Sequence, residues 1–426
     1  MNKDKHVIVI SVDAMITSDI AEFEKRPNMK AILAHSARVD EMHCIYPTYT
    51  YPCHTSIMTG CYPDKHGIYH NDIFDLNSSY VKWFWYAKDI KRPTMIDVAH
   101  EAGLTTGSVV FPVQGGSKAD YLIAEIWTPK MDEDPSKVFK SVDSPAVEHI
   151  FEENKHMLNW LKTPEFDLFA SKCACDIIKE FKPNLLFIHF SYLDHQRHRC
   201  GYETKNNLHA IDFIDERIGE VRKAVLDAGI SQETDFVILG DHGQINVDTV
   251  FHINKLLADQ GYIDLDENGK VKDWRIFVHS TSFSGQVYTK GIDLSEAKKV
   301  LMDLREKYPE YIERVMNKFE VKEIYHLDGP FDFVLEAQTH VIFGQGLTGD
   351  LCNKPEPGNY KFSLSTHGYA PEKGPNPPFI ISGPDANVGN VIKQARLVDE
   401  ASTIMSIFGL EMPEGVDGHV VEGLIK

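Results

Sequence analysis

Short, uninterrupted apolar runs separated by helical patterns constrain the fold of this chain more than any other feature. A run of valine and isoleucine without alternation indicates a strand that is buried on both faces. Such runs lie at residues 6–12, 184–190, 236–239 and 378–382, with a weaker one at 106–111. Between them, residues 93–103 and 204–228 have helical spacing and glycines at their ends. The sequence therefore predicts an α/β fold with a mostly parallel central sheet flanked by helices.

The stretch from residue 265 to residue 350 has a different pattern. It carries a charged helix at 294–307 and several short strand-like segments, which is typical of a small α+β unit. A chain of 426 residues is long enough for two domains. We expect residues 1–264 and 351–426 to form a metal-binding catalytic core. Residues 265–350 would form an inserted α+β cap that contributes to substrate choice.

Acidic and histidine side chains gather at the ends of the predicted strands. Five of them stand at or after apolar runs, namely Asp13, Asp194, His198, Asp241 and His242, and an isolated His367 follows much later in Ser-Thr-His-Gly. Ligands of parallel α/β sheets bind beyond the carboxyl ends of the strands. Taken singly, each residue is also explained as a turn former or as a helical i,i+4 pair. Together, mixed imidazoles and carboxylates suit zinc, and also manganese or iron. The set predicts two divalent metal ions, with zinc preferred, in a hydrolase site.

Residues 47–71 contain the most specific motif, Pro-Thr-Tyr-Thr-Tyr-Pro-Cys-His, followed by Thr-Gly-Cys-Tyr-Pro-Asp-Lys-His-Gly-Ile-Tyr-His-Asn. Pro52 suits the first turn of a helix. Thr50 would then lie at a helix N-terminus, where backbone N–H groups attract phosphate oxygens. Thr50 is either a helix cap or a nucleophile whose hydroxyl is activated by a base or metal. The carboxylate and histidine set favours the nucleophile.

These motifs resemble those of the nucleotide pyrophosphatase/phosphodiesterase family, within the alkaline phosphatase superfamily. The matching stretches run from residue 7 to about residue 384. The resemblance implies that Thr50 is the nucleophile and that Asn71 hydrogen-bonds a phosphoryl oxygen. It also implies an alkaline phosphatase-like fold and two ions. One ion would be held by Asp194, His198 and His367, and the other by Asp13, Asp241, His242 and the Thr50 oxygen.

The resemblance implies a two-metal phosphodiesterase that acts through a phosphothreonyl intermediate. The chain departs from the family pattern at Tyr51 and Cys53, and at Arg197, where a glycine is usual. These departures leave the nucleotide preference open. With Asn71 as the phosphoryl contact, a singly charged diester is favoured, and Tyr51, Phe111 and Tyr121 are candidates to stack on one substituent. The alternatives are a phosphonate or phosphomonoester hydrolase of the same superfamily, and a catalytically silent metal-binding relative.

Composition narrows the partners and the compartment. The net charge of −19 excludes a protein that binds duplex nucleic acid through a basic stripe, but a small phosphorylated substrate remains compatible. A nucleotide, a sugar nucleotide or a lipid headgroup diester would suit the site. No apolar run is long enough to span a membrane and no signal peptide is apparent. Seven scattered cysteines favour a reducing cytoplasm. The sequence carries no signal for an oligomeric state.

Overall fold

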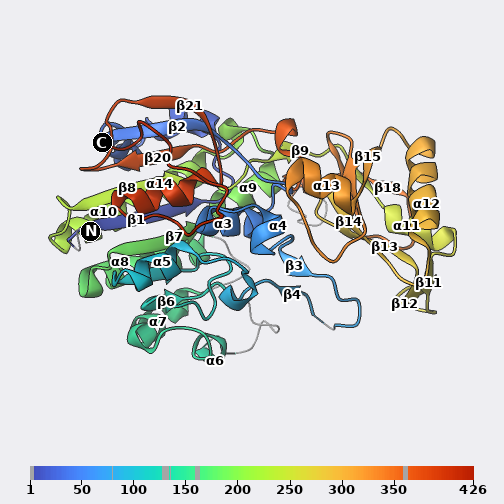
Figure 1. Cartoon of the computed structure of the whole chain (residues 1–426), viewed down its shortest axis with the longest axis horizontal. Coiled ribbons are helices and arrows are strands. Elements are labelled where there is room, and N and C mark those ends of the chain that lie inside the picture. The colour runs from blue at the N-terminus through green and yellow to red at the C-terminus, as the bar shows by residue number, and fades with distance from the viewer. Residues whose placement is uncertain (1–3, 79, 127–133, 135, 159–163, 358–362) are drawn as a thin grey trace.

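The computed structural model describes residues 4–78, 80–126, 134, 136–158, 164–357 and 363–426, and its larger part is built on an eight-stranded sheet (Figure 1). From edge to edge the strands are β21 (Val391–Arg396), β2 (Ser36–His43), β20 (Phe379–Ser382), β8 (Thr234–Leu239), β1 (His6–Val12), β7 (Leu185–Phe190), β5 (Thr106–Val109) and β6 (Tyr121–Ile123). Among the described strands of this sheet, β20 alone runs antiparallel to both of its neighbours. The predicted α/β fold with a mostly parallel sheet is therefore present, with one reversed strand.

The apolar strands contribute side chains to two hydrophobic cores, one on each face of the sheet. In β1, Val7 and Val9 pack into one core, whereas Ile8, Ile10 and Val12 pack into the other. Successive side chains of a strand face opposite sides, so a strand covered on both faces is apolar throughout. One face is covered by α3 (Thr50–Thr59), α5 (Met95–Glu101) and α14 (Asp399–Ile407), and the other by α2 (Pro27–Leu33), α8 (Glu165–Phe181) and α10 (Leu208–Asp227).

Both helices predicted from spacing are present with shorter bounds. The helix α5 begins after Thr94, whose side chain accepts the Asp97 backbone N–H, and α10 begins only at Leu208 because residues Thr204–Asn206 form a separate 3-10 turn. The shorter elements around the core are α1 (Ile20–Phe23), α4 (Pro63–His66), α6 (Ser136–Phe139), α7 (Glu148–Asn154), α9 (Tyr192–Cys200), β3 (Asp72–Ile73), β4 (Lys82–Trp83), β9 (Ile245–Asn246) and β19 (Ser365–Thr366). In the described ranges, no helix has both the length and the apolarity needed to cross a bilayer.

A second unit, drawn in yellow and orange in Figure 1, is inserted between β9 and β19. Its antiparallel sheet has the order β13 (Ile276–Ser280), β14 (Ser284–Thr289), β16 (Phe333–Ala337) and β15 (Ile312–Asn317). Around it lie α11 (Ile253–Asp259), α12 (Leu294–Lys307), α13 (Lys318–Tyr325), β10 (Thr249–Phe251), β11 (Ile263–Leu265), β12 (Val271–Trp274), β17 (Val341–Phe343) and β18 (Cys352–Asn353).

The inserted unit has its own hydrophobic core. That core includes Phe251 and Ile253 near the start of the inserted segment and Phe343 near its end, and Cys352 packs against it. The packed unit therefore begins before residue 265, the boundary that the change of sequence pattern suggested. In the sequence, residues 249–264 resemble a continuation of the α/β core, because α11 has an ordinary amphipathic pattern. In the structure, the apolar side chains of α11 contact the inserted sheet.

Candidate active site

The first group of candidate ligands lies where β1 and β8 end. These strands are parallel neighbours in register, with Ser11 opposite Leu239, so the residues that follow them meet at one edge of the sheet. Ligand atoms of Asp13, Asp241 and His242 all lie within 4.8 Å of one another. The Ala14 backbone N–H donates to Asp241 Oδ1 at 3.0 Å, which holds the two strand ends together.

The second group combines a helix with a segment that follows the inserted unit. Asp194 and His198 are one turn apart on α9, and their side chains share one helix face. His367 follows β19, which pairs with β9 just beyond His242. The rings of His367 and His242 are stacked with centroids 4.0 Å apart. Asp194, His198 and His367 also offer ligand atoms within 4.8 Å of one another.

Three histidines of these groups are oriented in the same way. Backbone carbonyls accept from Nδ1 in each of them: Gly243 for His242, Ser365 for His198 and Thr48 for His367, at 3.2, 2.8 and 3.2 Å. The unprotonated Nε2 atoms then face carboxylates. His242 Nε2 lies 3.5 Å from Asp13 Oδ1 and 3.2 Å from Asp241 Oδ2, and Asp194 oxygens lie 3.3 Å from His198 Nε2 and 3.7 Å from His367 Nε2. A nitrogen lone pair and a carboxylate that face each other repel unless a cation lies between them. Metal-bound histidines likewise donate their second ring N–H to a carbonyl or carboxylate, as these three do to backbone carbonyls.

Burial makes this concentration of carboxylates unfavourable without a cation. Asp13 Oδ1 and Asp241 Oδ2 are buried and have no hydrogen-bond partner among the described residues. Burial, and then the charges of Asp241 and Asp194, raise the pKa of Asp13 well above its usual value. Burial likewise raises the pKa of Asp241 to about 8. The pKa of His242 is lowered well below its usual value by burial, and that of His367 to about 4, so both rings are neutral. Orphaned oxygens beside neutral imidazoles fit a pair of divalent transition-metal ions.

Thr50 is the first residue of α3, and Tyr49 occupies the N-cap position. Thr50 is therefore not the cap, which removes the structural alternative for its hydroxyl. Its Oγ1 lies 3.2 Å from His242 Nε2, on the side where Asp13 and Asp241 converge. The hydroxyl thus sits beside the first ligand group and at a helix N-terminus, where backbone N–H groups favour an anion.

Asn71 is oriented by the same helix. Its Oδ1 accepts the Tyr51 backbone N–H at 2.9 Å, so the Nδ2 amide group is left as its donor. Asn71 lines the same cavity as Thr50. The amide is therefore placed to donate to an oxygen of a group bound at Thr50, whereas the Tyr51 N–H is already engaged.

A cavity of about 650 Å³ opens over these residues. The core side is lined by Thr50, Asn71, Asp13 of the first ligand group and all three residues of the second group. The inserted unit contributes Ser280, Ser282 and residues 342–346. Within the described residues, neither lysine nor arginine lines this cavity. The α/β core thus forms the floor of the cavity, and the inserted unit forms its upper wall.

The three aromatic residues expected to stack on substrate lie in different places in the structure. Tyr51 lines the cavity, and its ring meets Trp83 edge-on with centroids 5.4 Å apart. Phe111 is fully buried and packs between His54 and Phe187 inside the core, so the expectation for it is corrected. Tyr121 is also corrected: it stacks on Phe181 at the edge strand β6, outside the lining of the cavity. The Phe111 ring packs in the core and the Tyr121 ring packs on the end of α8, so neither ring is directed into the cavity.

Four further residues that line the cavity were not predicted from the sequence. Trp83, Glu125, His252 and Phe343 all line the cavity. Trp83 lies in an aromatic-rich stretch, Trp83-Phe84-Trp85-Tyr86, which was a usable signal. The others come from the inserted unit or from a strand end without a motif, so only the tertiary structure brings them to the site.

Comparisons with known proteins identify the family of the chain. The family model "Type I phosphodiesterase / nucleotide pyrophosphatase" matches residues 7–370. The chain belongs to this family. A rat protein, ectonucleotide pyrophosphatase/phosphodiesterase family member 1, is 24% identical over 231 residues, which cover 51% of this chain and 22% of the relative. The Xenopus laevis bis(5'-adenosyl)-triphosphatase is 21% identical over 278 residues, covering 62% of this chain and 52% of the relative.

Solved structures show the same fold. Murine ectonucleotide pyrophosphatase/phosphodiesterase 5 superposes with a TM-score of 0.69 and 18% identity, covering 99% of this chain and all of that chain. An inactive threonine-to-alanine variant of that protein, in complex with AMP, gives a TM-score of 0.70 at 18% identity and the same coverage. The alkaline phosphatase-like fold predicted from the motifs is thereby confirmed.

Proposed function

We propose that the chain is a two-metal phosphodiesterase of the nucleotide pyrophosphatase type that acts through a phosphothreonyl intermediate. The observation that carries the proposal is the position of Thr50, whose hydroxyl lies beside His242 at a helix N-terminus and lines the cavity. The inactive threonine-to-alanine relative supports a nucleophilic threonine in the family.

Two groups of residues would hold the ions, with zinc the best match to their donors. One group is Asp13, Asp241 and His242 together with the Thr50 oxygen, and the other is Asp194, His198 and His367. When bound, such ions would supply positive charge that lowers the pKa of a hydroxyl and stabilises the oxygens of an in-line displacement.

The chain's own residues would divide the reaction between them. Thr50 Oγ1 loses its proton to solvent and forms a bond to phosphorus while the bond from phosphorus to the leaving oxygen breaks. The Asn71 amide donates to an equatorial phosphoryl oxygen, where charge develops. Water then attacks the threonyl ester, the bond between phosphorus and Thr50 Oγ1 breaks, and the hydroxyl is regenerated.

The cavity favours a singly charged diester. Recognition of a phosphomonoester dianion usually relies on a guanidinium or ammonium group, and none lines the cavity within the described residues. Nucleotide diesters are the favoured class, because AMP is bound by the structural relative and the Tyr51 and Trp83 rings offer an aromatic wall. The upper wall from the inserted unit would contribute to the choice of substituent.

Replacement of the hydroxyl tests the proposal. T50A should reduce diester turnover at least ~10³-fold while the metal content is retained, because three protein ligands of each group remain. T50S, which keeps a hydroxyl, should retain measurable turnover. Acid-quenched wild-type protein should carry a phosphoryl adduct on the Thr50 peptide. Full activity of T50A would end the proposal. Faster hydrolysis of a nitrophenyl monoester or phosphonate than of bis-nitrophenyl phosphate would instead favour the related hydrolases.

A further inference from the structure

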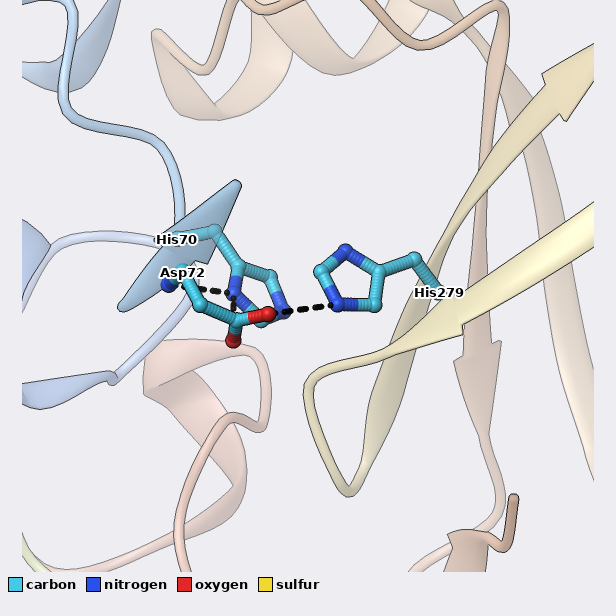
Figure 2. Close-up of side chains that lie close together, drawn as sticks. All are labelled: His70, Asp72 and His279. Carbon is cyan, nitrogen blue, oxygen red and sulfur yellow. Dashed lines mark hydrogen bonds and ion pairs between the residues drawn. The ribbon is translucent and has the colours of Figure 1, made fainter. Parts of the chain in front are cut away.

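A third group of imidazole and carboxylate side chains lies at the junction of the core and the inserted unit (Figure 2). His70 and Asp72 belong to the core segment around β3, and His279 reaches across from β13 of the inserted unit. His70 Nδ1 lies 2.9 Å from Asp72 Oδ1, and His279 Nε2 lies 3.0 Å from Asp72 Oδ2. The two rings are stacked with centroids 4.1 Å apart. One ligand atom from each residue falls within 4.8 Å of the others.

The hydrogen bonds of His70 repeat the arrangement of the catalytic histidines. Its Nε2 lies 3.2 Å from the Ser280 backbone carbonyl, which places the proton of a neutral ring on that nitrogen. Its Nδ1 is then unprotonated, in agreement with the Asp72 backbone N–H that points at it from 3.0 Å. This nitrogen, which already accepts that N–H, also lies beside a carboxylate oxygen of Asp72. A cation shared by the ring and the carboxylate would relieve the repulsion, as it would for His198, His242 and His367.

Asp72 carries the negative charge of this group. Burial opposes ionisation of Asp72, but His70 and His279 outweigh it and hold the pKa of Asp72 well below its usual range. The carboxylate is therefore ionised. Burial lowers the pKa of His279, so that ring stays neutral. No lysine or arginine forms an ion pair with Asp72 among the residues the structure describes. His279 Nδ1 is buried and has no hydrogen-bond partner there.

We propose that His70, Asp72 and His279 bind a third divalent transition-metal ion of the zinc class, which joins the inserted unit to the core. Two imidazoles and one carboxylate are a zinc-type donor set, and water would complete the coordination. The inference does not rest on the proposed hydrolase activity, because it uses none of the residues assigned to that reaction.

The position of this site gives the third ion a role at the cavity. Asn71 stands between His70 and Asp72 in the sequence, and Ser280, the neighbour of His279, lines the upper wall. The His70 ring also contacts Tyr49, the N-cap of α3, with centroids 5.2 Å apart. An ion here would fix the distance between the Asn71 amide and the wall of the inserted unit.

Zinc stoichiometry tests the proposal. Purified protein is dialysed against limiting free Zn²⁺ and the bound metal is counted by mass spectrometry. H279N should bind one zinc fewer per chain than wild type, and D72N should lose the same ion. H340N is a matched control, because His340 lies in the same unit, is exposed, and has a positive φ of 68° that asparagine tolerates. T50A should keep the third ion, so failure of the hydrolase proposal leaves a different signature.

Anomalous diffraction at the zinc edge of wild-type crystals provides a second readout that needs no variant. A peak about 2.0–2.2 Å from His70, Asp72 and His279 is expected. Equal zinc content in wild type and H279N would overturn the proposal and leave a hydrogen-bonded bridge. If H279N fails to fold, an empty junction in the anomalous map of zinc-soaked crystals overturns it equally.

Discussion

The Arg197–Asp19 pair offers a quantitative test of how the site is held. Arg197 lies on α9 between Asp194 and His198, and its Nη2 donates to both Asp19 oxygens at 2.7 and 2.8 Å. Its Nη1 donates to the carbonyl of Ala14, the residue after Asp13. Both side chains are fully buried. The guanidinium therefore does not reach the cavity, and it ties the helix of one ligand group to the strand end of the other.

The size of the effect follows from this burial. Replacing Asp19 by asparagine keeps the shape but leaves the Arg197 guanidinium without its counter-charge. Breaking a buried pair in this way costs about 3–5 kcal/mol, because one charge stays desolvated. The double variant D19N/R197M removes both charges and should recover a large part of the loss. Its non-additivity would measure the coupling between the two side chains.

Urea unfolding of the metal-loaded protein provides the assay, with E22Q, at a partly exposed position, as a control. Glu22 pairs with Lys25 and Arg26 at the surface, and its removal should cost much less than that of Asp19. D19N should also bind zinc more weakly, since the Arg197 guanidinium, which links α9 to the Ala14 carbonyl, loses the carboxylate that positions it. A D19N protein whose unfolding free energy stays within about 1 kcal/mol of wild type would refute the reasoning.

Three further outcomes are expected. N71A should lower kcat for a diester about 10²–10³-fold at unchanged zinc content, and an undiminished kcat would remove Asn71 from the reaction. F111A should cost about 3–5 kcal/mol of stability because the ring is fully buried, with no change in KM, and a raised KM in a fully stable variant would return Phe111 to the substrate wall. In chelator, the free energy of unfolding should fall from pH 7 to 8. The pKa of Asp241 is about 8 in the folded state and about 3.9 in the unfolded state, so over this pH interval only the folded state loses a proton from Asp241, which lowers its stability. The histidines of the unfolded chain titrate near ~6.5 and have largely lost their protons below this interval. Denaturation curves that show rising stability over this interval would contradict the raised pKa.

The fold was predictable where the signal is local and repeated. Uninterrupted apolar runs identified β1, β7 and β8 because both faces of these strands are covered by helices. The direction of β20 was not predictable, since an apolar run has the same composition in either orientation. Nor did the sequence pattern locate the true start of the inserted unit, because α11 carries an ordinary amphipathic pattern and only its partner differs.

The candidate site divides in the same way. Asp13, Asp194 and Asp241 follow strands that proved to be parallel neighbours, so their convergence follows from the sheet. The aromatic residues Phe111 and Tyr121 could not be placed, because a stacking role depends on which layer a ring faces. The Arg197–Asp19 pair was equally hidden, since its partners lie 178 positions apart and no motif joins them. The metal roles of these residues and the cytoplasmic location remain predictions.

The inserted unit separates His242 from His367 along the chain, and β20 enters the sheet only after both. During synthesis the ribosome would release five of the six candidate ligands before the inserted unit, and all six before β20 fills the gap between β8 and β2. A polypeptide that ends before His367 would thus carry the complete group of Asp13, Asp241 and His242 but only two of the three residues of the other group. Any phosphate chemistry that needs both groups would have to wait until the inserted unit and His367 have been synthesised.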